Sequence, residues 1–407
     1  MITVDERIAK LAEQHRFPPD IVALLSETFG FEKCERILTC LRTPPPIYYL
    51  RVNTMLVDRD KIIDMLEEIG IRAIPHPQLE EAVGIPVEGP FEIEPCEKKV
   101  VADKFACESV MMGADLYVPG VISAKDVKKG DRVAIVDKHG EQIALGIALM
   151  NSKEILAARK GVAVKVVKSI YKVPSIRGTP LYEEGYVYEQ SLPSILTSRI
   201  LDPKPGSLVV DMCAAPGGKA THIAQLMRGE GLVLAFDRSK ARACKMEEQV
   251  RRMKLKNVIV AVKNSLFLDL EYPNLKADAV LVDPPCSDLG VRPKLYEEKN
   301  LEAIKAVARY QRQFLKVAAR LLKPGGVLVY STCTLTVEEN EDNVEFCINE
   351  LGFEVEEQQL YLGSRGVKGK SASFVQRFFP DTHETPGFFI AKMRKVKDTM
   401  HFSNTCS

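Results

Sequence analysis

The sequence predicts a doubly wound parallel α/β sheet as its principal fold, with smaller domains in the amino-terminal half. From about residue 193, apolar runs of strand length alternate with amphipathic helical segments, which is typical of a parallel sheet covered on both faces. Between residues 98 and 171, short β-rich runs are punctuated by glycine, which indicates a small β-barrel. The length of 407 residues also exceeds one ordinary domain.

The composition is that of an ordinary globular chain, with 46% hydrophobic and 27% charged residues. No apolar run approaches the ~20 residues needed to cross a bilayer, and the amino terminus lacks the features of a signal peptide. The ten cysteines form no C-x-x-C pair, so we expect reduced thiols, without a metal site or a disulfide framework. We therefore expect a cytoplasmic, monomeric protein with no membrane or metal partner.

Residues 1–97 predict a helical region followed by a small α+β unit. Apolar residues at helical spacing mark short amphipathic helices between residues 5 and 43, and the prolines at 44–46 end them. A strand is expected at 48–52 and a helix at 58–69, closed by Gly70. We expect this unit to resume at about 172–192, after the predicted barrel.

The β-rich segment 98–171 has its strand-like runs at 112–121, 130–136 and 143–146. It resembles a PUA domain, with Gly-Ala-Asp-Leu-x-x-Pro-Gly-Val at 113–121 and Lys-Gly-Val-Ala-Val at 160–164 in the places of that family's motifs. The resemblance implies an RNA-binding module. A barrel of another kind is the alternative.

A basic stretch lies at the end of this segment. The net charge of +1 provides no global field for nucleic acid, so any basic surface must be local. The stretch from 159 to 177 contains no acidic residue and six basic ones: Arg159, Lys160, Lys165, Lys168, Lys172 and Arg177. Composition alone fits a solvated strand face equally well. The PUA resemblance favours RNA, and we predict RNA contacts for Arg159, Lys160, Lys165, Lys168 and Lys172.

Residues 193–395 predict the parallel sheet. Strands are expected at 208–211, 232–237, 258–262, 279–283 and 327–331, with a last strand at 387–393. Helices are expected from 220, from 239, over 301–322 and from 338. We expect residues 396–407 to form a flexible tail.

A cofactor site is predicted where the first of these strands ends at Asp211. The run Cys213-Ala214-Ala215-Pro216-Gly217-Gly218-Lys219 makes a glycine turn into a helix, where a ligand can approach the backbone. Asp237 closes the second strand, twenty residues beyond Gly217, where a carboxylate can accept both ribose hydroxyls of an adenosine. The pattern fits NAD or S-adenosylmethionine. The absence of G-x-G-x-x-G favours the cofactor without phosphates.

Asn264 follows the third strand, where class I methyltransferases hold the adenine amino group with Asp or Asn. An amide oxygen can accept that hydrogen bond. A cap of a turn or helix is an equally good interpretation of Asn264.

Two cysteines stand at predicted strand ends: Cys286 in Asp283-Pro-Pro-Cys-Ser, and Cys333 in Tyr-Ser-Thr-Cys-Thr. Both strands should end at one edge of the sheet, where open α/β sheets bind ligands. A thiolate can add to C6 of cytosine and so activate C5 for methylation, and a carboxyl such as Asp283 can assist at N3. Either cysteine alone could instead be a small buried core residue.

Residues 185–395 resemble the catalytic domain of the NOL1/NOP2/Sun family of RNA 5-methylcytosine methyltransferases. Three motifs match it in order: the run from Asp211 to Lys219, Asp283-Pro-Pro-Cys286-Ser, and Tyr330-Ser-Thr-Cys333-Thr followed by Glu-Glu-Asn-Glu at 338–341. The resemblance implies a class I, Rossmann-like fold that binds S-adenosylmethionine. The implied cofactor-binding residues are Cys213, Ala214, Ala215, Pro216, Gly217, Gly218, Lys219, Asp237, Arg238, Asn264 and Asp283.

The same resemblance implies the roles of the reacting groups. Cys333 is the nucleophile, Cys286 assists release of the methylated RNA, and Lys219 and Asp283 contact the base or handle protons. Lys219 could instead stabilise the glycine turn by its charge. The reverse assignment of the two thiols, as in DNA cytosine methyltransferases, is the nearest rival.

The PUA-like insertion narrows the resemblance to a subgroup that methylates tRNA near the acceptor end, with an RRM-like domain at 48–97 and 172–190. Two departures stand out: aromatic RNP sequences are missing, and Asn264 replaces the Asp of many relatives. We therefore predict a tRNA cytosine-C5 methyltransferase. The alternatives are an rRNA cytosine-C5 methyltransferase, a non-catalytic RNA-binding protein on the same scaffold and, less favoured, an enzyme that acts on DNA.

Overall fold

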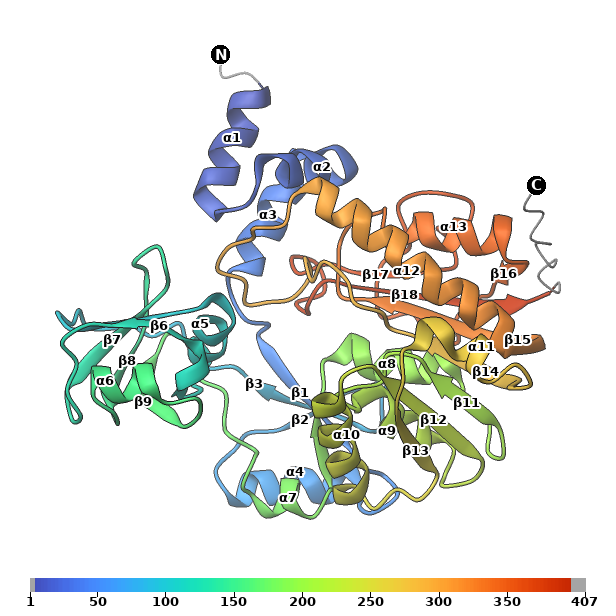
Figure 1. The fold of residues 1–407 in the computed structure, drawn as a ribbon, viewed down its shortest axis with the longest axis horizontal. Helices are drawn as coiled ribbons and strands as arrows, with labels where there is room; N and C mark the ends of the chain where they lie inside the picture. The colour runs from blue at the N-terminus through green and yellow to red at the C-terminus, as the bar shows by residue number, and fades with distance from the viewer. Residues whose placement is uncertain (1–3, 397–407) are drawn as a thin grey trace.

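The computed structural model describes residues 4–396, and three sheets organise the molecule (Figure 1). The predicted tail falls almost wholly on residues 397–407, which lie outside the described residues. Among the described helices, none is long and apolar enough to span a membrane.

Three helices form the amino-terminal region: α1 (Val4–His15), α2 (Pro19–Phe29) and α3 (Phe31–Leu41). They pack around buried Leu25, Ile37 and Leu38, as the helical spacing predicts. Their apolar cluster also contains Leu289 and Leu335 from the loops that follow Cys286 and Cys333. The helices therefore support the loops that carry the thiols.

A four-stranded sheet in the order β10-β1-β3-β2 follows. Its elements are β1 (Ile47–Val52), α4 (Arg59–Glu68), β2 (Ile74–Pro75), β3 (Ala82–Pro86), α7 (Pro180–Glu183) and β10 (Val187–Glu189). Strand β10 lies beyond the predicted barrel in the chain and pairs antiparallel with β1, with Arg51 opposite Tyr188. The chain thus leaves this sheet and returns to complete it, as predicted.

A six-stranded sheet in the order β5-β9-β8-β7-β4-β6 occupies the segment between. Its elements are β4 (Lys99–Ala102), α5 (Lys104–Val110), β5 (Leu116–Tyr117), η1 (Val118–Gly120), β6 (Val121–Ala124), β7 (Arg132–Val136), β8 (Gln142–Ala148), α6 (Ser152–Ala157) and β9 (Val162–Ser169). The predicted β-rich run at 112–121 is strand only in part. Gly113 has φ +100°, and Pro119 has no amide hydrogen for a ladder bond, so only two residues of strand precede a 3₁₀ turn.

The large sheet has the order β13-β12-β11-β14-β15-β18-β16, and β17 pairs with β18. Its strands are β11 (Leu208–Asp211), β12 (Leu232–Asp237), β13 (Val258–Val262), β14 (Ala277–Val282), β15 (Leu322–Thr332), β16 (Phe353–Val355), β17 (Gln376–Phe378) and β18 (Phe388–Lys395). Strands β11 to β15 are parallel to one another, whereas β18 runs antiparallel to β15. An apolar run carries no direction, so the sequence did not predict this reversal, and β16 and β17 are too short to show periodicity.

Helices cover both faces of this sheet (Figure 1). They are α8 (Leu192–Leu201), α9 (Gly218–Leu226), α10 (Lys240–Arg252), α11 (Leu268–Glu271), α12 (Leu301–Leu321) and α13 (Glu341–Glu350), with η2 (Ser265–Phe267) after β13. One apolar cluster joins the sheet to α8, α9 and α10, and a second joins it to α12 and α13. The doubly wound architecture is therefore confirmed.

Candidate active site

The candidate site lies where β11, β14 and β15, adjacent in the sheet, end at one edge. Asp211 closes β11, Asp283 follows β14, and Cys333 follows β15. Because these strands are parallel, their carboxyl ends bring the three side chains to one place, as the sequence predicts.

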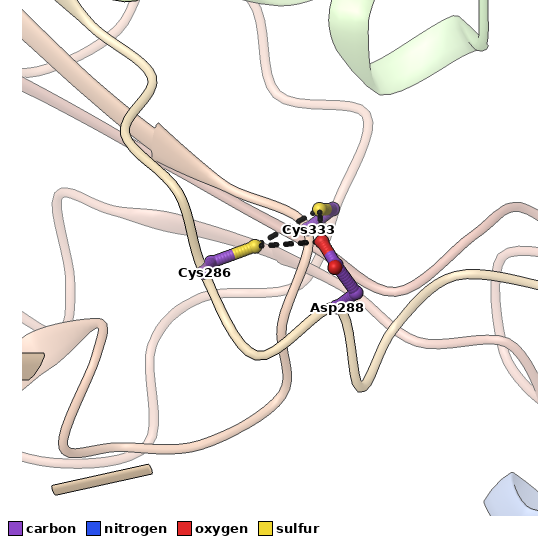
Figure 2. Close-up of side chains that lie close together, drawn as sticks. All are labelled: Cys286, Asp288 and Cys333. Carbon is purple, nitrogen blue, oxygen red and sulfur yellow. Dashed lines mark hydrogen bonds between the residues drawn. The ribbon is translucent and has the colours of Figure 1, made fainter. Parts of the chain in front are cut away.

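The two cysteines meet at this edge. The Sγ atoms of Cys286 and Cys333 are 3.0 Å apart. Figure 2 shows both thiols turned toward Asp288, whose Oδ1 accepts hydrogen bonds from Cys333 Sγ at 3.1 Å and from Cys286 Sγ at 3.3 Å. Neither cysteine is fully buried, and each contacts a second thiol and a carboxylate, which favours the functional interpretation over that of a small core residue.

Both thiols favour their protonated forms. The hydrogen bond to Cys333, together with burial, holds the pKa of Cys286 well above its usual range. The same hydrogen bond acts to lower the pKa of Cys333, but burial and the charges of Asp288 and Asp283 outweigh it and raise that pKa. Of the two, Cys333 is the thiol whose ionised form receives a hydrogen bond.

Glu339, fully buried, fixes the loops that carry the thiols. Its Oε1 accepts hydrogen bonds from the Ser287 amide at 2.8 Å and from Gln311 at 3.0 Å. Its Oε2 accepts from Thr334 and Thr336. Asn340 accepts from the Thr332 hydroxyl and donates to the Thr334 carbonyl, on either side of Cys333. The prediction that this helix starts at 338 is therefore wrong, and α13 begins at Glu341. One carboxylate thus ties the residue after Cys286 to the residue after Cys333.

An ion pair between Lys219 and Asp283 lies beside the two thiols. Lys219 Nζ and Asp283 Oδ2 are 2.7 Å apart, and Ser331 donates to Asp283 Oδ1 at 2.7 Å. Burial acts to lower the pKa of Lys219, but Asp283 and Asp211 outweigh it, so that pKa is raised. Burial and then the charge of Asp283 raise the pKa of Asp211 to about 7. The pair offers an ammonium donor and a carboxylate acceptor to one ligand.

A cavity of about 340 Å³ runs from Asp237 and Asn264 to Cys286 and Cys333. Its volume falls in the range of small-molecule sites. Asp237 is buried at the second strand end, accepts from the Ser239 amide at 2.8 Å and retains acceptor capacity for ribose hydroxyls. These groups fit S-adenosylmethionine, since an adenosine at Asp237 would place its sulfonium end toward the thiols.

A neighbouring cavity of about 230 Å³ has Lys219 and Asp283 in its wall, together with Gln190, Ser194 and Asp211. Cys213, Ala215 and Asp283 line both cavities. Two ligands bound in these cavities would therefore lie against one another at Asp283.

The structure brings the predicted cofactor-binding residues together. Ten of them line one cavity or both: Cys213, Ala214, Ala215, Pro216, Gly218, Lys219, Asp237, Arg238, Asn264 and Asp283. Gly217 lines neither, but its φ of +109° makes the turn into α9. Asn264 caps η2, accepting from the Leu266 amide at 3.2 Å, and it also lines the cavity, so its contact with adenine stays a prediction.

The predicted RNA-contacting residues lie away from these cavities, on the six-stranded sheet and its flanks. All five are at least partly exposed: Arg159, Lys160, Lys165, Lys168 and Lys172. Lys165 and Lys168 belong to β9, and Lys165 is paired with Asp115 at 2.9 Å. These five exposed basic side chains, called the basic edge of this domain below, are accessible to an external polyanion.

Sequence reasoning missed Asp288 and Arg51. Asp288 stands two residues after Cys286 in the same motif, and that proximity was an available signal. Arg51, fully buried in β1, donates to Thr221 Oγ1 at 2.8 Å and to the Gly218 carbonyl in the cofactor turn. No local pattern connects β1 with a turn so distant in the chain.

Fold and site together define a class I methyltransferase scaffold with a dithiol at its cofactor edge. Three family models match the chain: the 16S rRNA methyltransferase RsmB/F family over residues 198–394, the PUA domain over 98–170, and the RsmF/B-like ferredoxin-like domain over 17–93. The last shows that the predicted RRM-like unit is of ferredoxin-like type.

Curated relatives match nearly the whole chain. It is 47% identical to a tRNA (cytosine(72)-C(5))-methyltransferase of Pyrococcus horikoshii, over 94% of this chain and 98% of the relative. It is 30% identical to the human tRNA (cytosine(72)-C(5))-methyltransferase NSUN6, over 93% and 95%. The solved structure of NSun6 from Pyrococcus horikoshii with SFG matches with a TM-score of 0.87 at 46% identity, covering 94% of this chain and 100% of that one.

The chain therefore belongs to the NOL1/NOP2/Sun family of RNA cytosine-C5 methyltransferases, in its PUA-containing branch. The predicted class I fold, the methyltransferase class and the dependence on S-adenosylmethionine are confirmed.

Proposed function

We propose that this protein methylates C5 of a cytosine in tRNA, near the acceptor end, by a covalent mechanism that uses both thiols. The observation that carries the proposal is the 3.0 Å approach of Cys286 and Cys333 at the wall of the cofactor cavity, beside the Lys219–Asp283 pair. The relatives named for cytosine 72 of tRNA support the substrate. Our assignment of a cytoplasmic, monomeric and metal-free enzyme remains a prediction.

The cavity at Lys219 would receive the target cytosine once it is extruded from the RNA. The Lys219 ammonium, rather than Asp283 as expected from the sequence, would donate to N3, and the Asp283 carboxylate that is paired with it would accept from the exocyclic amino group. Polarising N3 makes C6 electrophilic, so Cys333 loses its thiol proton to water, its thiolate sulfur adds to C6, and C5 gains enamine character. S-adenosylmethionine supplies the methyl group that C5 receives.

Release requires loss of the C5 proton and cleavage of the bond between C6 and Cys333. Cys286, 3.0 Å from Cys333, is placed to assist this elimination. Recognition of RNA outside the cytosine would fall to the PUA domain and its basic edge, through backbone shape and phosphates.

The test uses purified protein, labelled S-adenosylmethionine and unmodified tRNA, with Cys244→Ala as a control because Cys244 is exposed and lines neither cavity. We expect 5-methylcytidine from the wild type and the control, none from Cys333→Ala, and an SDS-resistant protein–RNA adduct from Cys286→Ala. An adduct from Cys333→Ala instead would reverse the thiol roles. Methylation of rRNA alone would overturn the assignment of tRNA as the substrate. Methylation of no RNA would overturn the assignment of the protein as an enzyme.

A further inference from the structure

Asp288 touches both thiols, and the mechanism above gives it no role. Its Oδ1 accepts from Cys333 at 3.1 Å and from Cys286 at 3.3 Å (Figure 2). Its other oxygen faces Lys299 Nζ at 3.9 Å, and 47% of its side chain is exposed. Asp288 thus combines contact with the reacting sulfur and access to water.

The reaction needs a base after the methyl group has arrived, because the C5 proton must leave before the C6–sulfur bond can break. A neutral thiol is a poor base, and Cys286 donates its proton toward Asp288. Asp283 is already engaged by Lys219 and Ser331. Glu339 is fully buried, with its oxygens occupied by the Ser287 amide and by threonine hydroxyls.

We propose that the Asp288 carboxylate is the base that removes the C5 proton during release of the methylated RNA. This rests on the proposed function. Cys333 Sγ would be bonded to C6, and C5 is the adjacent ring atom, so an oxygen 3.1 Å from that sulfur lies on the reacting side of the base.

The step balances as a β-elimination. The C5–H bond breaks, and its proton passes to Asp288 Oδ1. The electron pair of that bond forms the C5–C6 double bond, while the C6–sulfur pair returns to Cys333 as a thiolate. Asp288 then gives the proton to water on its exposed side, and the Cys333 thiolate recovers from water the proton that it lost before addition, so the whole cycle releases the one proton of C5 methylation. Cys286, by donating to the same oxygen, holds the base in place, and this explains its role in release.

The test follows the C5 proton in RNA that carries tritium at C5 of cytosine, with Asp288→Asn. Asn keeps the size and tolerates the φ of +61°, but it cannot accept the proton. We expect the rate of tritium release to fall by about 10²-fold, the scale of a lost general base. Methylated RNA that retains its tritium should accumulate as an adduct on Cys333.

Asp202→Asn is the matched control. Asp202 also has a positive φ, of +51°, is partly exposed and paired with a lysine, and lines neither cavity. It should release tritium at the wild-type rate. Asp288→Glu restores a carboxylate and should recover release in part.

Two outcomes would overturn the assignment while the wild type remains active. Asp288→Asn could release tritium at the wild-type rate, or it could lose methyl transfer itself without any adduct, which would limit Asp288 to positioning the thiols. Wild-type protein that releases tritium from no RNA would overturn the proposed function, and the role of Asp288 with it.

Discussion

At the scale of single residues, the environment gives two chemically identical thiols different tendencies to ionise. The Cys286 thiol lies within hydrogen-bond distance of both Asp288 and Cys333, and it can turn from Asp288 to donate to Cys333 when that sulfur is ionised. The sequence motifs alone are enough to identify both cysteines. Asp288 stands two residues after Cys286 in the sequence, but only the structure shows that its carboxylate contacts both sulfurs.

We expect Cys286→Ala to shift the titration of Cys333 upward. Cys286 donates the hydrogen bond that lowers the pKa of Cys333, so its loss leaves burial and the nearby carboxylates to raise that pKa further. Alkylation by iodoacetamide, followed by peptide mass spectrometry across pH, reports the midpoint, with Cys244 as an exposed reference thiol. A midpoint for Cys333 that stays constant or falls in Cys286→Ala would show that the hydrogen bond from Cys286 does not lower the pKa of Cys333.

At the scale of elements, parts distant in sequence hold the site in place. The four-stranded sheet reaches the cofactor turn through Arg51, and the segment 287–300 leads from the thiol loop to the PUA domain. Leu295 and Tyr296 of that segment are buried in the apolar cluster of the PUA domain. Helix and strand positions followed from periodicity, but these connections did not, because they depend on which surfaces meet.

We expect Arg51→Met to weaken the binding of S-adenosylmethionine by roughly ten-fold, which corresponds to about 1.4 kcal/mol. The change removes the donors that fix the Gly218 carbonyl and Thr221. Isothermal titration without RNA measures this affinity. Arg252→Met is the control, because Arg252 bonds the carbonyls of Tyr182 in α7 and Val187 in β10, but not the turn. Unchanged affinity in Arg51→Met would show that the cofactor turn keeps its binding conformation without the hydrogen bonds from Arg51.

We expect the free energy of unfolding to depend on pH through Glu297, which lies in the segment 287–300. Burial opposes its charge, but Lys294 and Lys104 outweigh burial and lower the pKa of Glu297 to about 2. Because the folded-state pKa is lowered, the stabilisation is present above about pH 4.5, the unfolded value, and is lost as the pH falls toward 2.

Glu297→Gln should therefore reduce the free energy of unfolding by up to about 3 kcal/mol at pH 7 and by less at about pH 3.5. Urea denaturation at the two pH values measures this difference. Glu298→Gln, at the exposed neighbouring position, should change little at either pH. An equal loss from Glu297→Gln at both pH values would mean that the ion pairs are not its source.

At the scale of the whole molecule, the proposed catalytic residues and the proposed RNA-contacting residues lie in separate domains. The dithiol and the cavities belong to the large sheet, whereas the basic edge belongs to the PUA domain. The sequence predicted both domains because each carries its own local motif. The ferredoxin-like sheet was harder to define, since β10 completes it from beyond the PUA segment.

We expect the double substitution Lys160→Ala, Lys168→Ala to reduce the salt dependence of tRNA binding without changing the affinity for S-adenosylmethionine. Each lost phosphate contact lowers the slope of log K against log salt by about 0.9 on duplex-like sites. Fluorescence anisotropy from about 50 to 300 mM salt measures this slope. Lys254→Ala, an exposed lysine of the catalytic domain, is the control. An unchanged slope would place the RNA elsewhere.

The sequence by itself determined the fold class, the cofactor class and the two candidate catalytic thiols, because strand periodicity, a glycine turn and cysteines at strand ends are all local patterns. Only the tertiary structure decided the direction of β18, the role of Glu339 in joining the thiol loops, the reach of Arg51 to the cofactor turn and the contact of Asp288 with both sulfurs. The physical reason is that hydrogen bonds and burial depend on distances between side chains, and those distances are set by how the sheets and loops pack rather than by separation along the chain.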